Sequence, residues 1–110
     1  MIQDRLDKIE EKLKQSKTIK ESDKAELLNL LVTLKTEITG LSQTHKEQAE
    51  SIAGFAELSA HEATRSKKSQ ALFDLSMEGL TSSVQGFEVS HPVLVEVINR
   101  FCTMLANMGI

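Results

Sequence analysis

Five apolar residues in the first half of the chain recur at alternating steps of four and three. They are Leu27, Leu31, Leu34, Ile38 and Leu41. This spacing places all five on one face of a helix and is typical of a coiled-coil seam. No proline interrupts the chain before Pro92. We therefore predict one long helix over residues 23–64, whose seam other helices must cover.

The seam changes character after Leu41. It passes through His45, where the repeat has a stutter, and continues through small residues. These small residues are Ala49, Ala53, Ala56, Ala60 and Ala63. Small seam residues let a partner helix approach closely. The simplest interpretation of His45 is a polar residue that fixes the register of packing, and a pH-sensitive contact is the alternative.

An unbroken helix over residues 23–64 would be about 60 Å long, because each residue adds about 1.5 Å. We therefore expect an elongated molecule. The alternative is a break near Gly40 or Gly54, but one glycine costs a helix only about 1 kcal/mol. Ser22 is the predicted N-cap of this helix.

Three shorter helices are predicted beside the long one. Residues 3–15 have apolar positions on one face and charged residues on the other. Residues 70–86 carry a second apolar stripe, after a polar turn at residues 65–70. Residues 92–108 are apolar on most sides apart from one narrow polar stripe. Most of this last helix should therefore be buried.

The segment GFEVSHP predicts a corner before the last helix. Its structural residues are Gly86, Phe87, His91 and Pro92. Glycine suits the left-handed end of a helix, while proline suits the first helical position and keeps the preceding residue out of the helical region. Gly109 is predicted to form a second left-handed cap that returns Ile110 to Leu105.

Composition and charge narrow the class of protein. Aromatic residues are 4% of the chain and the net charge is −3, which favours helices and gives no general attraction to nucleic acid. We expect no nucleic-acid partner. Cys102 is the single cysteine, so no intrachain disulfide can form, and an inert buried thiol is expected.

Nothing in the chain predicts a membrane span. The first residues lack the continuous apolar core of a signal peptide. The longest apolar region, residues 92–110, contains Glu96, Asn99 and Arg100. We expect a cytoplasmic protein without a transmembrane segment.

One segment, HEATR, shares part of a zinc-protease pattern. Arg65 stands where the second histidine would be, and a guanidinium cannot bind zinc. Glu57 and His61 lie one helical turn apart and are expected to be solvated. We predict no catalytic, cofactor-binding or metal-binding residues, although spacing alone leaves open whether His45 or His61 binds a metal.

Two stretches of the chain resemble a bacterial protein family, domain of unknown function 4404. They are Phe87, Glu88, His91, Pro92 and Leu94, and the closing Ala106, Asn107, Met108, Gly109 and Ile110. The leucine-rich segment over residues 27–41 is similar as well. The resemblance implies a small helical cytoplasmic protein and carries no activity, substrate or site.

These observations predict a single all-α domain over residues 1–110. We expect an elongated antiparallel helical hairpin or bundle with coiled-coil-like packing. Because three short helices do not obviously cover a seam about 60 Å long, dimerisation should complete the bundle. The predicted self-association seam comprises Leu27, Leu31, Leu34, Ile38, Leu41, Val97, Phe101 and Leu105.

The predicted function is that of a non-catalytic, self-associating helical scaffold or adaptor without a cofactor. A homodimer is favoured, with room for an unidentified protein partner. The alternative is a membrane-surface or partner-helix binding module that uses the apolar helix over residues 92–108.

Overall fold

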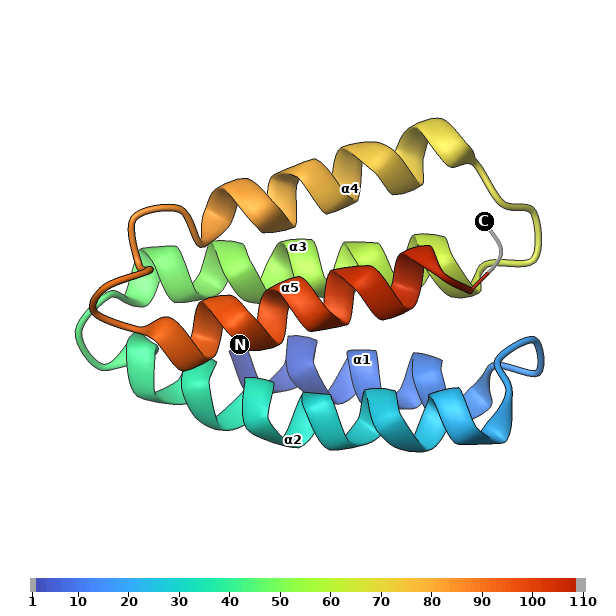
Figure 1. Cartoon of the computed structure of the whole chain (residues 1–110), viewed down its shortest axis with the longest axis horizontal. Helices are drawn as coiled ribbons and strands as arrows, with labels where there is room; N and C mark the ends of the chain where they lie inside the picture. The colour runs from blue at the N-terminus through green and yellow to red at the C-terminus, as the bar shows by residue number, and fades with distance from the viewer. Residues whose placement is uncertain (1, 109–110) are drawn as a thin grey trace.

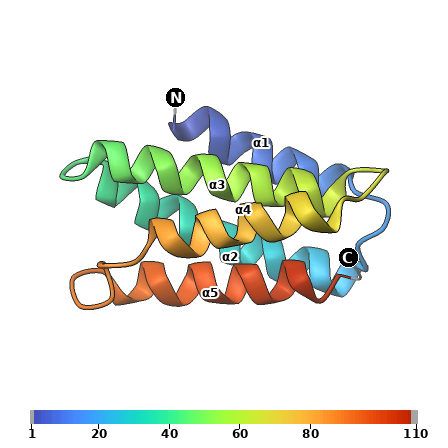
Figure 2. The ribbon, with the colours of Figure 1, turned by 90° about the horizontal axis from the view of Figure 1, so that it is seen from above.

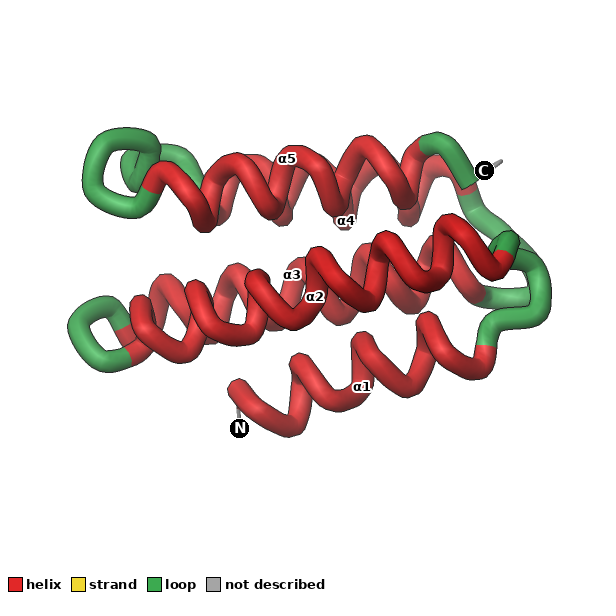
Figure 3. The backbone as a smooth tube through the Cα atoms, turned by 60° about the horizontal axis from the view of Figure 1, so that its bottom comes forward, coloured by secondary structure: helices red, strands yellow, loops and turns green. Residues whose placement is uncertain are grey.

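The computed structural model describes residues 2–108, which form five helices and contain no strand (Figure 1). The helices are α1 (Ile2–Gln15), α2 (Glu21–Ser42), α3 (Lys46–Thr64), α4 (Gln70–Ser83) and α5 (Pro92–Ala106). Consecutive helices run in opposite directions (Figure 1). The four connecting turns therefore gather at the two ends of the bundle, as the tube in Figure 3 shows.

The long helix predicted over residues 23–64 is wrong, because a turn at residues 43–45 separates α2 from α3. Gly40 and Gly54 both lie inside helices. The break occurs at the stutter, where Leu41 O accepts the backbone N–H groups of Thr44 (3.1 Å) and His45 (2.7 Å). Folding α3 back on α2 buries both halves of the seam in one core. The molecule measures 37 × 25 × 23 Å, so the predicted elongation is also wrong.

Helix α3 lies at the centre of the bundle and contacts each of the other four helices. Figure 2 shows it running between α1 and α4. The face that meets its neighbours contains Ile52 and five alanines with no exposed surface, namely Ala49, Ala53, Ala56, Ala60 and Ala63. The short side chains on this face let the neighbouring helices approach closely.

Helices α2 and α5 supply most of the large core side chains. Helix α2 packs against α1, α3 and α5. The apolar face of α5 points into the core through Leu94, Val97, Ile98, Phe101 and Leu105. The opposite face carries the predicted polar stripe, which is exposed. The expectation that most of α5 is buried is therefore correct for its apolar face only.

The helix ends confirm some sequence signals and correct others. Pro92 begins α5 as predicted. Ser69 is the N-cap of α4, and its hydroxyl accepts the N–H of Leu72 at 3.3 Å. Ser22 is not the cap of α2, because helical bonding already begins with Lys24 N–H donating to Lys20 O.

Two further helix ends had been predicted. Helix α4 ends at Ser83 rather than at residue 86, and Gly86 follows in the left-handed region with φ of 97°. The predicted cap at Gly109, with its contact between Ile110 and Leu105, lies outside the described residues.

A charged network joins α1 to α2. Lys35 of α2 lies 2.5 Å from Glu10 and 3.5 Å from Asp7, and Lys14 lies 2.7 Å from the other Glu10 oxygen. The hydrogen bond from Lys14, followed by that from Lys35, lowers the pKa of Glu10 to about 2. The hydrogen bond to Glu10 raises the pKa of Lys35.

We predict that Ala56→Leu destabilises the fold by about 1–3 kcal/mol, because the added methyl groups have no space between α3 and its neighbours. Urea unfolding followed by circular dichroism measures this. Ala25→Leu is the matched control, since Ala25 is exposed on α2 and should tolerate the same change. Equal effects of the two substitutions would contradict the central position of α3.

We also predict that the Glu10–Lys35 contact loses its stabilising effect in acid. The folded-state pKa of Glu10, about 2, lies below its ordinary value of 4.5. The stabilisation is therefore complete above about pH 4.5 and falls away towards pH 2. Lys35→Met should lower the free energy of unfolding at pH 7, and the difference from wild type should shrink between pH 4.5 and pH 2. The exposed Lys46→Met is the control, and a pH-independent difference for Lys35→Met would refute the assignment.

Candidate functional site

The predicted self-association seam lies in the core of a single chain. All eight of its residues are at most 6% exposed. The expected pairing of residues 27–41 with the C-terminal helix is present, but α2 and α5 of the same chain form it. A second copy could reach this seam only if the bundle opened.

The predicted corner brings its four residues together at one end of the bundle. Gly86 supplies the left-handed backbone, and His91 is the N-cap of α5 with Pro92 after it. The backbone N–H of His91 donates to Phe87 O at 2.8 Å. The rings of Phe87 and His91 meet edge to face, with centroids 5.5 Å apart. The corner is therefore a closed turn held by an aromatic contact.

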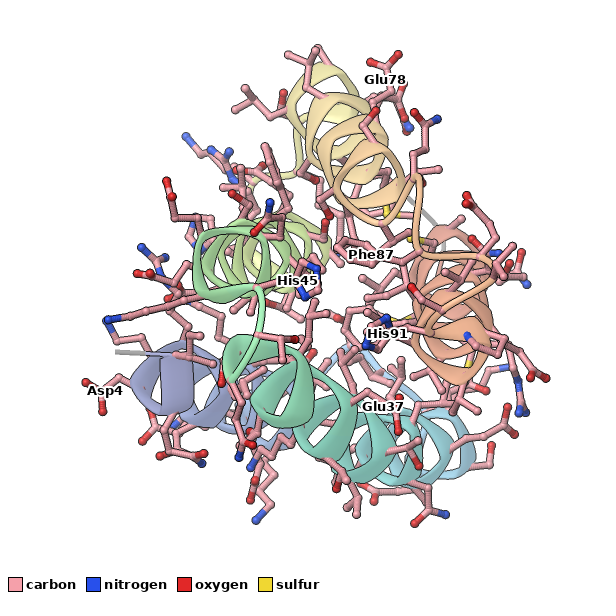
Figure 4. All side chains as sticks on the ribbon, turned by 90° about the vertical axis from the view of Figure 1, so that its left-hand side faces the viewer. Asp4, Glu37, His45, Glu78, Phe87 and His91 are labelled. Atoms are coloured by element: carbon pink, nitrogen blue, oxygen red, sulfur yellow. The ribbon has the colours of Figure 1, made fainter. Side chains whose placement is uncertain are left out.

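His45 joins this corner from the turn between α2 and α3. Its ring lies 5.5 Å from that of Phe87 and 6.1 Å from that of His91, measured between centroids. Figure 4 shows the three side chains together at the end of the bundle. Sequence reasoning treated the two histidines separately because they lie far apart in the chain. One signal was available, since each histidine follows a hydroxyl residue and precedes a helix, as Thr44 and Ser90 show.

The HEATR segment is a set of structural contacts. Glu62 is buried and accepts a hydrogen bond from Arg65 at 2.9 Å. His61 Nδ1 lies 3.3 Å from Lys12 Nζ, and Glu57 forms an ion pair with Arg5 at 3.0 Å. Glu57 and His61 thus each pair with a cation of α1. Among residues 2–108, no group of three or more histidine, cysteine or acidic side chains is arranged to hold a metal ion.

Cys102 is half-buried on α5. Burial raises the pKa of its thiol, and a hydrogen bond with Thr81 of α4 opposes this only in part. The thiol therefore stays protonated at neutral pH, which disfavours reaction as a nucleophile.

An apolar surface lies on the outer side of α3 and α4, and we name it the α3–α4 stripe. It consists of Phe55, Leu58, Leu72 and Leu75, which are 37–61% exposed. Gly79 lies beneath the Phe55 ring, so close that a Cβ there would clash with the ring. Leu72 and Leu75 precede Gly79 by seven and four residues, which puts them on the same side of α4. The stripe therefore meets α4 where the Phe55 ring covers Gly79, while Leu58 also borders Arg5 and Lys12 of α1.

Sequence reasoning missed this stripe. Phe55 and Leu58 lie outside the alanine seam, and Leu72 and Leu75 lie outside the apolar stripe predicted for residues 70–86. The only signal was the presence of large apolar residues away from each seam.

A groove follows the outer face of α5 and has a volume of about 640 Å³. Its lining combines charged side chains such as Glu26, Glu96 and Arg100 with apolar ones such as Val95 and Met104. No described helix is both long and apolar enough to cross a membrane.

Comparison with known proteins gave one match. The family model "Domain of unknown function (DUF4404)" matches residues 55–110, which contain the corner, the α3–α4 stripe and all of α5. Neither the curated proteins nor the solved structures contain a match to the chain. The match covers about half of the 110 residues, so the chain belongs to the domain of unknown function 4404 family.

Proposed function

We propose that this protein is a non-catalytic, self-associating helical adaptor whose two copies pair through the α3–α4 stripe. The observation that carries the proposal is the exposure of four large apolar side chains on α3 and α4 in a chain whose coiled-coil seam is already buried. The proposed contact between copies therefore involves the exposed stripe, which a second copy can reach, and not the seam predicted from the sequence. An unidentified protein partner would bind elsewhere on the bundle.

Burial of the stripe would supply the driving force. Covering a half-exposed leucine or phenylalanine gains about 1 kcal/mol, and a symmetric pair would cover eight such side chains. The loss of translational and rotational freedom costs a comparable amount of free energy. We therefore expect a dimer that forms with rising concentration.

Charges at the two ends of α3 favour a second copy as the occupant. Glu47 and Glu50 lie in the first turns of α3, whereas Lys67 and Lys68 follow its last turn at the opposite end of the bundle (Figure 1). A two-fold axis across the stripe makes the two copies of α3 antiparallel. The glutamates of one copy then face the lysines of the other, which favours this pairing.

Non-catalytic action is part of the proposal. Among residues 2–108, the groups with displaced pKa values are Glu10, Lys35 and Cys102, and each has a local cause in an ion pair or in burial. Glu10 and Lys35 join α1 to α2, while Cys102 packs on α4. A single cysteine, which forms no intrachain disulfide, suits the proposed cytoplasmic location.

We do not favour the alternative function, in which the protein contacts a membrane or a partner helix through the apolar face of α5. That face is buried against the other helices. Met77, Met104 and Met108 are likewise partly buried against the core.

The stripe predicts a specific effect on mass in solution. Wild-type protein should approach the mass of a dimer as concentration rises, measured by light scattering. The double variant Leu58→Glu/Leu75→Glu should remain a monomer, because the glutamates would be buried without partners at the contact. Its free energy of unfolding should change by less than about 1 kcal/mol, since both side chains are exposed in the single chain.

Val32→Glu is the matched control, because Val32 is 66% exposed on α2 and lies outside the stripe. It should dimerise like wild type. Charge reversal tests the antiparallel orientation of the two copies. Lys67→Glu should weaken the dimer, and the double variant Lys67→Glu/Glu50→Lys should restore it. The proposal would be contradicted by a wild-type protein that stays monomeric at every concentration. It would also be contradicted if Leu58→Glu/Leu75→Glu dimerised like wild type.

A further inference from the structure

We propose that His45 and His91 form a binding site for one divalent transition-metal ion at the end of the bundle. The two residues come from the α2–α3 turn and the α4–α5 turn, which the fold places side by side (Figure 4). The site lies within one chain, so it does not depend on the proposed self-association.

The separation of the two rings fits a shared ion. Zinc lies about 2.0–2.1 Å from an imidazole nitrogen, so the centroids of two imidazoles on one ion are at most about 6.4 Å apart. The centroids of His45 and His91 are 6.1 Å apart. Both rings also contact the edge or face of Phe87 at 5.5 Å, which holds them at this end of the bundle. The limit of about 6.4 Å belongs to a linear arrangement; a tetrahedral ion places the two centroids about 5.2 Å apart, so the rings must approach each other by about 1 Å to share it.

The outer contacts of the two histidines orient them alike. Nδ1 of His45 lies 2.8 Å from the Thr44 hydroxyl, and Nδ1 of His91 lies 2.9 Å from the Ser90 hydroxyl. A hydroxyl that accepts the Nδ1 proton leaves the lone pair of Nε2 free for a metal, the usual arrangement around metal-binding histidines.

The backbone conformations of His45 and His91 are also alike. Each histidine is the N-cap of the following helix, with φ, ψ of −135°, 64° at His45 and −137°, 62° at His91. The two turns therefore present imidazoles in nearly the same local geometry.

The surroundings determine what kind of ion fits. His45 is exposed and His91 is half-exposed, so water can complete the coordination. Imidazole ligands favour Cu²⁺, Ni²⁺ and Zn²⁺ over Mg²⁺ and Ca²⁺. Since no third ligand group accompanies the pair within residues 2–108, affinity should be lower than at a three- or four-ligand site.

Glu88 adds negative charge to the same corner. Its carboxylate accepts the backbone N–H of Gly86 at 2.9 Å. A bound ion would join two turns that are distant in sequence, and ligand binding to the folded state alone raises its stability.

The site is tested by titrating untagged protein with Zn²⁺ and with Ni²⁺. Calorimetry measures the binding, and the melting temperature measures the effect on stability. We expect one ion per chain and a rise in melting temperature, with no effect of Mg²⁺. His45→Ala and His91→Ala should each weaken binding at least tenfold. His61→Ala is the matched control, because His61 lies on α3 beside Lys12, and it should bind like wild type.

A second readout needs no variant. Paramagnetic Ni²⁺ at one equivalent should broaden the NMR signals of the His45, His91 and Phe87 rings and leave those of His61 sharp. Equal broadening of all three histidines, or equal affinity in the His45→Ala and His61→Ala variants, would overturn the proposal and leave an aromatic packing cluster only. Absence of stoichiometric binding by wild type would overturn it as well.

Discussion

Short side chains on the buried face of α3 allow four other helices to pack against it. The five buried alanines leave room for α1, α2, α4 and α5 to contact the same helix, and large side chains from α2 and α5 fill the remaining core. This close approach depends on the turn at residues 43–45, which folds α3 back beside α2. A single chain can therefore bury a seam that an extended helix would leave exposed.

The same turn determines which apolar side chains remain exposed and where His45 lies. Once the leucine seam is buried within the chain, the exposed leucine and phenylalanine side chains of α3 and α4 are those of the α3–α4 stripe. The turn also brings His45 to the corner formed by Phe87 and His91. The proposed contact with a second copy and the proposed metal site thus both arise from one break in a helix, on different parts of the bundle.

Local sequence signals predicted most helices but not their arrangement. Pro92 marks the start of α5, and the apolar spacing identified the buried faces of α2 and α5, because these signals act over one or two turns of helix. No proline or glycine lies within the turn at residues 43–45. Backbone hydrogen bonds to Leu41 close this turn, and burial of both helices in one core favours it. The stripe and the histidine pair join distant segments, so spacing along the chain could not reveal them.

The central claim is that the leucine seam is closed within one chain while contacts between copies involve the stripe. Isotope-filtered NMR on an equimolar mixture of labelled and unlabelled protein tests both parts at once. We expect intermolecular NOEs from the methyl groups of Leu58 and Leu75 and none from those of Leu34 and Ile38. Intermolecular NOEs from Leu34 and Ile38 would instead demonstrate a dimer that exchanges helices across the seam, and would contradict this account.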